Sequence, residues 1–154
     1  MVKTKNRLWV CMTLIFLNIA FIWGNSLLTA EYSRSFSMWV KGLLSWLLPV
    51  GEEAGRDEGH HLLRKLAHFT EFACLGMLLS WLVRMLCNAK WERICLPLMA
   101  GAGVACVDEI IQIFVPGRGP GIKDVGIDTL GVLTGIVLIC LYERIKLKYW
   151  RKLK

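Results

Sequence analysis

The chain has 154 residues, of which 55% are hydrophobic, and it carries a formal net charge of +7 at pH 7. The apolar residues are gathered into long runs, which is typical of an integral membrane protein rather than a soluble globular one. The basic residues lie at the ends of these runs, where they anchor helices to an anionic leaflet, so we expect no nucleic-acid partner. The length allows one domain, which we expect to cover residues 1–154.

The first apolar run covers residues 8–28 and follows a short basic segment. A membrane span needs about 20 apolar residues, and this run supplies them. A cleaved signal peptide also begins with basic residues, but the run is long for a signal and the cleavage pattern near Ala30 is poor. We therefore expect a first span that is retained.

The connection over residues 31–65 has two parts of different character. Its first part is apolar and rich in tryptophan but too short to cross a membrane, which predicts an interfacial helix that ends near Pro49. Its second part, residues 51–61, is polar and rich in glycine, so we expect a solvated loop there.

Three further apolar runs cover residues 66–86, 94–115 and 125–142. With the first run they predict an all-α integral membrane four-helix bundle. Gly131 and Gly135 in the last run have the GxxxG spacing that lets two helices approach closely in lipid. The cysteines lie in or beside the runs without a CxxC pair, and we interpret them as small apolar residues.

The basic residues also predict the orientation of the bundle. Most of them precede the first span, lie between the second and third spans, or follow the fourth. The positive-inside rule therefore places both termini in the cytoplasm. The start of the second span, the end of the third and the start of the fourth then lie at one depth near the outer leaflet. The opposite halves of these spans are almost purely apolar, which disfavours a transport path across the membrane.

A group of polar side chains belongs to that outer level. Its members are Lys65, His68, Glu71, Asp108, Glu109, Gln112, Arg118, Asp124 and Asp128. An ionisable residue inside a span costs about 2.5–3.5 kcal/mol on insertion scales, so such residues are the first candidates for a functional site. We predict that these nine residues bind a ligand. We expect Arg118 to stay hydrated in its glycine- and proline-rich turn and to hold a carboxylate or phosphate with its planar guanidinium.

Two other interpretations of the group stay open. The charges can form a salt-bridged cluster that only holds the helices together, or they can perform acid–base catalysis. The catalytic residues are not identified by the pattern, and the candidates are His68, Glu71, Asp108 and Glu109. We expect no serine or cysteine in a nucleophile–base arrangement. The HxxE spacing of His68 and Glu71 is far less specific than HExxH, so we expect neither a metal nor a cofactor.

Three motifs of the chain resemble the VanZ-like family of small bacterial membrane proteins. In chain order they are Lys65-x-x-His68-Phe69-x-Glu71, then Asp108-Glu109-x-x-Gln112 with Arg118 downstream, then Asp124-x-x-x-Asp128 followed by Gly131-x-x-x-Gly135. Together they extend over residues 64–135. Asp128 stands where many relatives have asparagine, which adds one carboxylate to the group.

The resemblance implies a multi-pass protein of the bacterial cell membrane, and the family is named for a protein linked to teicoplanin resistance. Together with the polar group, it leads to a predicted function: an outward-facing site that binds an anionic amphiphilic molecule of the cell envelope and affects teicoplanin susceptibility. The expected partner is a membrane lipid or a lipid-linked envelope molecule. The alternative is a membrane-embedded hydrolase or transferase that acts on a lipid-linked envelope substrate. Binding is preferred because paired charges are abundant and a nucleophile is missing.

Overall fold

The computed structural model describes residues 2–28, 56–119 and 121–152. These residues form four helices and no strand: α1 (Val2–Leu27), α3 (Arg56–Leu86), α4 (Glu92–Ile113) and α5 (Ile122–Lys152). Each helix contains a segment that is long and apolar enough to cross a membrane. The prediction of an all-α bundle with four spans is therefore confirmed. The predicted interfacial helix before Pro49 lies outside the described residues.

Two helices are longer than the apolar runs that predicted them. α3 begins at Arg56, so the loop predicted over residues 51–61 is wrong from Arg56 onwards, and residues 51–55 lie outside the described part of the chain. α5 continues past the predicted span to Lys152. The extension of α5 is rich in arginine, lysine and leucine, which have high helix propensities, so this helix continues into polar sequence where hydropathy no longer marks a span. The first turn of α3 contains Gly59, and its helix propensity does not explain the early start.

The turn between α4 and α5 begins earlier than the apolar run suggests. α4 ends at Ile113, and the backbone N–H of Phe114 donates to the carbonyl oxygen of Ile111 at 3.1 Å. Pro116 disfavours the helical conformation for the residue before it, which explains this early end. Gly117 has a φ of 76°, a conformation that glycine adopts without strain, and so it turns the chain towards α5.

The backbones of α3 and α5 approach each other closely. A Cβ atom on Gly131 would lie 2.6 Å from the carbonyl oxygen of Phe69, and one on Gly135 would overlap the carbonyl oxygen of Ala73. Gly76 on α3 faces the backbone of α5 in the same way. No larger residue fits at these positions without displacing a helix. The packing predicted from the GxxxG spacing is thus confirmed.

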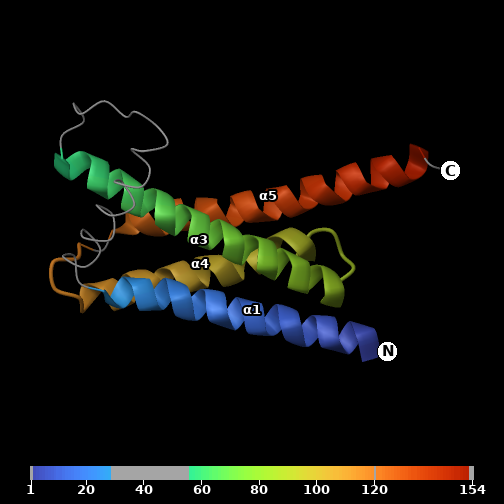
Figure 1. Ribbon diagram of the computed structural model, residues 1–154, viewed down its shortest axis with the longest axis horizontal. Coiled ribbons are helices and arrows are strands. Elements are labelled where there is room, and N and C mark those ends of the chain that lie inside the picture. Colours follow the sequence, from blue (N-terminus) through green and yellow to red (C-terminus); the bar gives the residue numbers. More distant parts are fainter. Residues whose placement is uncertain (1, 29–55, 120, 153–154) are drawn as a thin grey trace, which may run out of the picture.

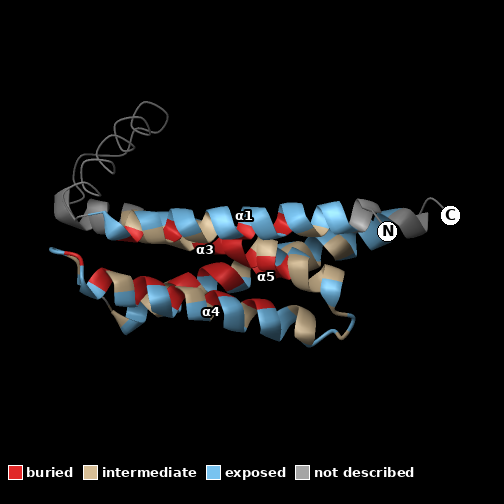
Figure 2. Cartoon of the chain, turned by 90° about the horizontal axis from the view of Figure 1, so that it is seen from below, coloured by how far each residue is buried: buried red, intermediate tan, exposed pale blue. Residues whose placement is uncertain are grey.

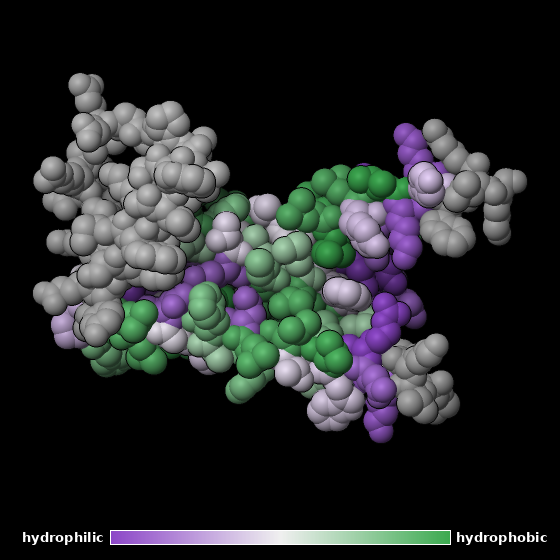
Figure 3. All heavy atoms as spheres, in the orientation of Figure 1, coloured by the Kyte–Doolittle hydropathy of each residue, from purple (hydrophilic) through white to green (hydrophobic). Residues whose placement is uncertain are grey.

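Apolar side chains fill the middle of the bundle and also cover its outside. The core contains Ile22, Phe72, Leu75, Val132 and Ile136, and Figure 2 shows the buried residues on the inward faces of the helices. Large apolar side chains are exposed on the outer faces of all four helices. In Figure 3 the hydrophobic surface covers the middle of the molecule. This distribution suits a bundle surrounded by lipid, and the chain is a multi-pass membrane protein.

Successive helices run in opposite directions, so the two ends of the bundle differ in composition (Figure 1). One end, here the polar end, carries Asn25, Ser26, Lys65, His68, Glu71, Asp108, Glu109, Gln112, Arg118, Asp124 and Asp128. The opposite end, here the basic end, carries Arg7, Arg84, Arg93 and Lys146. The N-terminus of α1 and the C-terminus of α5 both lie at the basic end. The fold therefore brings the polar groups of three predicted spans to one level.

Candidate functional site

Asp108 lies at the centre of the polar end and is completely buried on α4. Its Oδ2 atom accepts a hydrogen bond of 2.8 Å from Ser26 Oγ and another of 2.8 Å from Gln112 Nε2. Gln112 Nε2 also donates to Ser26 Oγ at 3.1 Å. Gln112 is one helical turn from Asp108, so the two side chains lie on the same face of α4. The three side chains form a closed ring of hydrogen bonds between α1 and α4.

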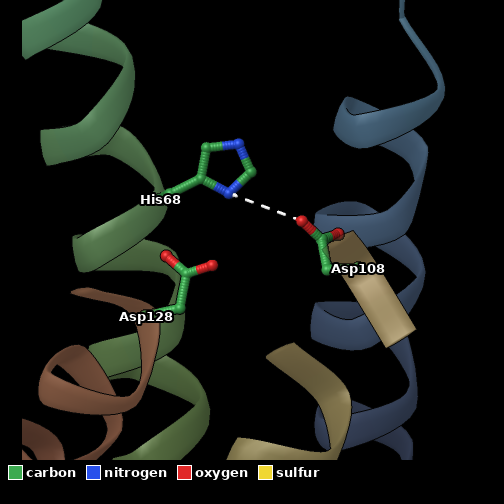
Figure 4. A group of neighbouring side chains, drawn as sticks. All are labelled: His68, Asp108 and Asp128. Atoms are coloured by element: carbon green, nitrogen blue, oxygen red, sulfur yellow. Dashed lines mark ion pairs between the residues drawn. The ribbon is translucent and has the colours of Figure 1, made fainter. Parts of the chain in front are cut away.

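His68 from α3 and Asp128 from α5 lie beside Asp108 of this ring (Figure 4). The Nδ1 atom of His68 lies 3.9 Å from Asp108 Oδ2, which is too long for a hydrogen bond. Asp128 is only 2% exposed. Neither His68 Nδ1 nor Asp108 Oδ1 has a hydrogen-bond partner within the described ranges. One ligand atom from each of the three residues lies within 4.8 Å of the other two.

This trio, His68, Asp108 and Asp128, is the set of described side chains that could hold a metal ion. Imidazole nitrogen and carboxylate oxygen are common ligands of zinc at about 2.0–2.2 Å, and three such ligands leave a position for a substrate or water. From the sequence we expected no metal, and the ligand set weighed there was His68 and Glu71 with Asp108 or Glu109. In the structure Glu71 binds Asn25 and Glu109 binds the backbone of Gly121. The third member of the trio is instead Asp128, which belongs to α5.

Glu71 faces α1 rather than the trio. Its Oε1 atom accepts a hydrogen bond of 2.9 Å from Asn25 Nδ2, while Oε2 has no partner in the described part of the chain. Asn25 and Ser26 were both missed as site residues in the sequence. Two adjacent polar residues at the end of a mainly apolar run were the signal that could have indicated them.

Glu109, Lys65 and Asp124 stabilise the start of α5. Glu109 Oε2 accepts a hydrogen bond of 2.9 Å from the backbone N–H of Gly121. Lys65 Nζ lies 3.2 Å from Asp124 Oδ1, and this ion pair joins α3 to the first turn of α5. The carboxylate of Asp124 is also favourably placed near the positive end of the helix dipole. These contacts hold the start of α5 against α3 and α4.

Arg118 binds the end of α1 instead of staying hydrated. Its Nη2 atom donates to the carbonyl oxygens of Leu28 at 3.0 Å and Asn25 at 3.1 Å, and its Nε donates to Leu28 at 3.3 Å. The last carbonyl groups of a helix lack partners within the helix, and Arg118 satisfies two of them. Burial lowers the pKa of the guanidinium, and Arg64 lowers it further, but an arginine remains charged at neutral pH.

A small cavity of about 20 Å³ opens among these residues. It is lined by Arg64, Lys65, His68, Glu109, Gln112, Asp124, Ile127 and Asp128. The volume is enough for a water molecule or a single small polar group. Six of the nine predicted site residues thus share one cavity. Asp108 does not line the cavity but lies 3.9 Å from His68, which does, whereas Glu71 and Arg118 are bound to α1.

The cavity offers hydrogen-bond donors, acceptors and both signs of charge. Ser26 is a serine among these groups, which the sequence did not lead us to expect. It is fully buried and donates to a carboxylate rather than to the imidazole, so it is not arranged as an activated nucleophile. His68, Asp108 and Asp128 could exchange protons with a bound group, since an imidazole and two carboxylates face one another.

Comparison with known proteins gives one result. The family model described as VanZ/LLP1 matches residues 7–143, which includes every residue of the polar end named above. Neither the curated proteins nor the solved structures contain a match to the chain.

Proposed function

Because the chain belongs to the VanZ/LLP1 family, we propose that it acts in the bacterial cell membrane by binding an anionic amphiphilic molecule of the cell envelope. The binding site in this proposal is the cavity at the polar end, which faces outward. Both termini then lie in the cytoplasm, and the basic end lies at the cytoplasmic leaflet as the positive-inside rule requires. The proposal includes an effect on susceptibility to teicoplanin, a lipoglycopeptide that combines an apolar tail with charged groups.

The observation that carries the proposal is a cation at the cavity wall that has no ion-pair partner among the described residues. Lys65 is paired with Asp124, whereas Arg64 takes part in no ion pair among the described residues. A guanidinium binds a phosphate or carboxylate through two parallel hydrogen bonds. Arg64 therefore provides the contact for an acidic headgroup at the mouth of the cavity.

The apolar surface beside the cavity suits the rest of such a molecule. Ile127 lines the cavity itself, and Leu66 on α3 is 51% exposed next to the Arg64–Lys65 segment. Ile122, at the start of α5, is 91% exposed. An acyl or prenyl chain can lie along these side chains in the bilayer while its headgroup contacts the cations.

Binding is tested with purified protein in detergent and two labelled probes, a long-chain polyprenyl phosphate and teicoplanin. We expect Arg64→Gln to weaken binding of at least one probe about tenfold, which corresponds to about 1.4 kcal/mol. The matched control is Lys123→Gln, because Lys123 is an exposed cation on the neighbouring α5 that does not line the cavity. The proposal fails if neither probe binds wild-type protein, or if the control loses as much affinity as Arg64→Gln.

The effect on susceptibility is tested in cells. A bacterium that expresses the wild-type chain should tolerate more teicoplanin than one that carries the empty vector, and expression of Arg64→Gln at an equal level should remove the difference. If cells with the wild-type chain and cells with the empty vector tolerate teicoplanin equally, the proposed effect on susceptibility is wrong. The proposed binding of an envelope molecule is then decided by the probe measurements alone.

A second candidate function, a hydrolase or transferase for a lipid-linked envelope substrate, is favoured by the trio of His68, Asp108 and Asp128. An imidazole beside two buried carboxylates is an arrangement that general acid–base catalysis uses. Mass spectrometry of the polyprenyl phosphate after incubation distinguishes the two functions. Unaltered lipid supports binding alone. Turnover that is lost in Asp128→Asn and retained in Thr129→Ala, its neighbour on α5, supports the enzyme.

A further inference from the structure

The basic end contains a second and much larger cavity, of about 840 Å³. Each of the four helices contributes one cation to its wall: Arg7 from α1, Arg84 from α3, Arg93 from α4 and Lys146 from α5. The hydrophilic side chains at this end are visible in Figure 3 near the N and C termini. The volume is within the range of about 300–1,000 Å³ that is usual for small-molecule sites.

One of the four cations is already neutralised within the protein. Arg84 has a side chain that is only 8% exposed, and its Nε atom lies 2.9 Å from Glu143 Oε2. Its terminal nitrogens also bind Ser80 and Cys140. Among the described residues that line the cavity, Glu143 is the only carboxylate, and it is held by Arg84. The cavity therefore keeps a surplus of positive charge.

The other three cations supply that surplus. Arg93 donates its Nε–H to the carbonyl oxygen of Cys87 at 3.1 Å, so its guanidinium is fixed by one backbone contact. Lys146 Nζ lies 6.0 Å from the centre of the Tyr142 ring, a weak cation–π contact at an exposed site. Arg7 is exposed on α1 and takes part in no described ion pair. These three residues converge on one cavity from three different helices.

The position of the cavity relative to the spans indicates what kind of anion enters it. Arg7 and Arg93 lie near the first residues of their spans, and Lys146 lies near the end of its span, so all three are at the level of the lipid headgroups. Trp81 and Tyr142 also line the cavity, and such aromatic rings are enriched at this level of a membrane. Further apolar side chains from α3 and α5 continue its wall.

We propose that this cavity binds an anionic phospholipid, with the phosphate held by Arg7, Arg93 and Lys146 and the acyl chains lying along the apolar wall. The three cations match a phosphate in charge, and the apolar side chains match the adjoining acyl chains. Basic cavities between membrane helices bind polyanionic headgroups by this combination of charge and lipid contact. The site is separate from the cavity at the polar end, so the two proposals stand or fall independently.

The test measures lipid binding to the purified full chain by native mass spectrometry and by microscale thermophoresis in a zwitterionic detergent. The probes are cardiolipin, phosphatidylglycerol, phosphatidylcholine and inorganic phosphate. We expect wild-type protein to prefer the two anionic lipids over phosphatidylcholine. We expect the double variant Arg93→Gln/Lys146→Gln to bind cardiolipin about thirtyfold more weakly, given the usual contribution of each basic residue at a membrane surface.

The matched control is the double variant Arg144→Gln/Lys148→Gln. It removes two exposed cations from the same part of α5, neither of which lines the cavity. The control should keep its affinity for cardiolipin. Equal losses in both double variants would show that only the total charge of the basic end matters, and the proposed site would be wrong. Equal binding of anionic and zwitterionic lipids to wild-type protein would have the same consequence.

Two further measurements keep the result interpretable. Inorganic phosphate should compete poorly, and displacement of cardiolipin by phosphate at similar concentrations would identify a soluble anion and overturn the assignment to a lipid. Arg84 is left unchanged in every variant, because its buried side chain also binds Ser80 and Cys140, and its removal would disturb the packing of α3 against α5. If the Arg93→Gln/Lys146→Gln variant unfolds, Arg7→Gln tests the same cavity, with an expected loss of about fivefold.

Discussion

Ser26 on α1 donates a hydrogen bond of 2.8 Å to Asp108 on α4, although 82 positions separate the two residues in the sequence. Both side chains are fully buried. A single serine changes the hydropathy of an apolar run very little, so the sequence does not mark Ser26 as a site residue. Its contact with Asp108 is apparent only in the structure. Among the described residues, Asp108 has no cation within hydrogen-bond distance, since His68 Nδ1 lies 3.9 Å away. Its carboxylate is instead accommodated inside the bundle because Ser26 on α1 and Gln112 on α4 both donate hydrogen bonds to its Oδ2 atom.

Removal of the Ser26 hydroxyl should lower the stability of the bundle. Ser26→Ala takes one donor from a fully buried carboxylate, and a buried acceptor that loses a partner costs about 1–3 kcal/mol. Thermal unfolding in detergent measures the effect. Thr13→Ala is the control, since Thr13 is an exposed residue of the same helix. If the two variants melt together, Ser26 does not support Asp108.

Arg118→Ala should also destabilise the protein. From the sequence we expected Arg118 to be hydrated, but in the structure its guanidinium caps the end of α1. The substitution removes the hydrogen bonds of Arg118 to the Leu28 carbonyl, which is exposed, and to the Asn25 carbonyl, which keeps the backbone N–H of Leu28 as a donor, so we expect a loss of about 0.5–1.5 kcal/mol per hydrogen bond. Arg118→Lys should restore little, because one ammonium cannot reproduce the planar fork. Thermal unfolding is compared with Lys123→Ala, an exposed cation nearby. If Arg118→Ala is as stable as the wild-type protein but binds the probes more weakly, Arg118 binds a ligand rather than the end of α1.

Substitutions of two glycines on α5 should have opposite effects. Gly135→Ala places a Cβ atom against the backbone of α3 and should cost several kcal/mol or prevent assembly, because backbone atoms cannot yield as a flexible side chain does. Gly126→Ala meets nothing within 4 Å on the same helix and should stabilise α5 by up to about 1 kcal/mol. Size-exclusion chromatography and thermal unfolding report on both. A tolerated Gly135→Ala would contradict the close packing of α3 and α5.

The orientation of the bundle is tested by cysteine labelling in intact cells. In a background with the native cysteines replaced by alanine, Gly119→Cys at the polar end should react with an impermeant maleimide, and Lys90→Cys at the basic end should react only after lysis. Both positions are exposed, so accessibility within the protein does not limit the reaction. The reverse pattern would place the polar end in the cytoplasm and would refute an outward-facing site.

The features that the sequence predicted correctly are those set by composition and local spacing. The length of an apolar run indicates a span directly, and Gly131 and Gly135 predict a close contact because their spacing places them on one helix face. The gathering of polar groups at one end also followed from the alternating direction of the spans. For the same reason Lys65 and Asp124 could be placed at one level, although their ion pair of 3.2 Å could not be predicted.

What could not be predicted depends on contacts between helices. Arg118 has the same sequence environment whether it binds a ligand or the end of α1, and only the packing of α1 decides between them. Asn25 and Ser26 gain their importance from Glu71 and Asp108, which belong to other helices. The helical start of α3 at Arg56 was missed because hydropathy identifies spans and not the polar turns beyond them.

The cap that Arg118 places on α1 has a consequence for biogenesis. Among the described helices α1 is synthesised first. Arg118, whose guanidinium binds the last carbonyl groups of α1, follows about ninety residues later, and Asp108 and Gln112, the partners of Ser26, follow more than eighty residues later. During synthesis the polar end of α1 therefore depends on water or headgroups at the membrane surface until α4 has been inserted. A chain that ends after α3 would already allow Asn25 to contact Glu71, but it would leave Ser26 and the last carbonyl groups of α1 without their partners on α4 and in the turn after it.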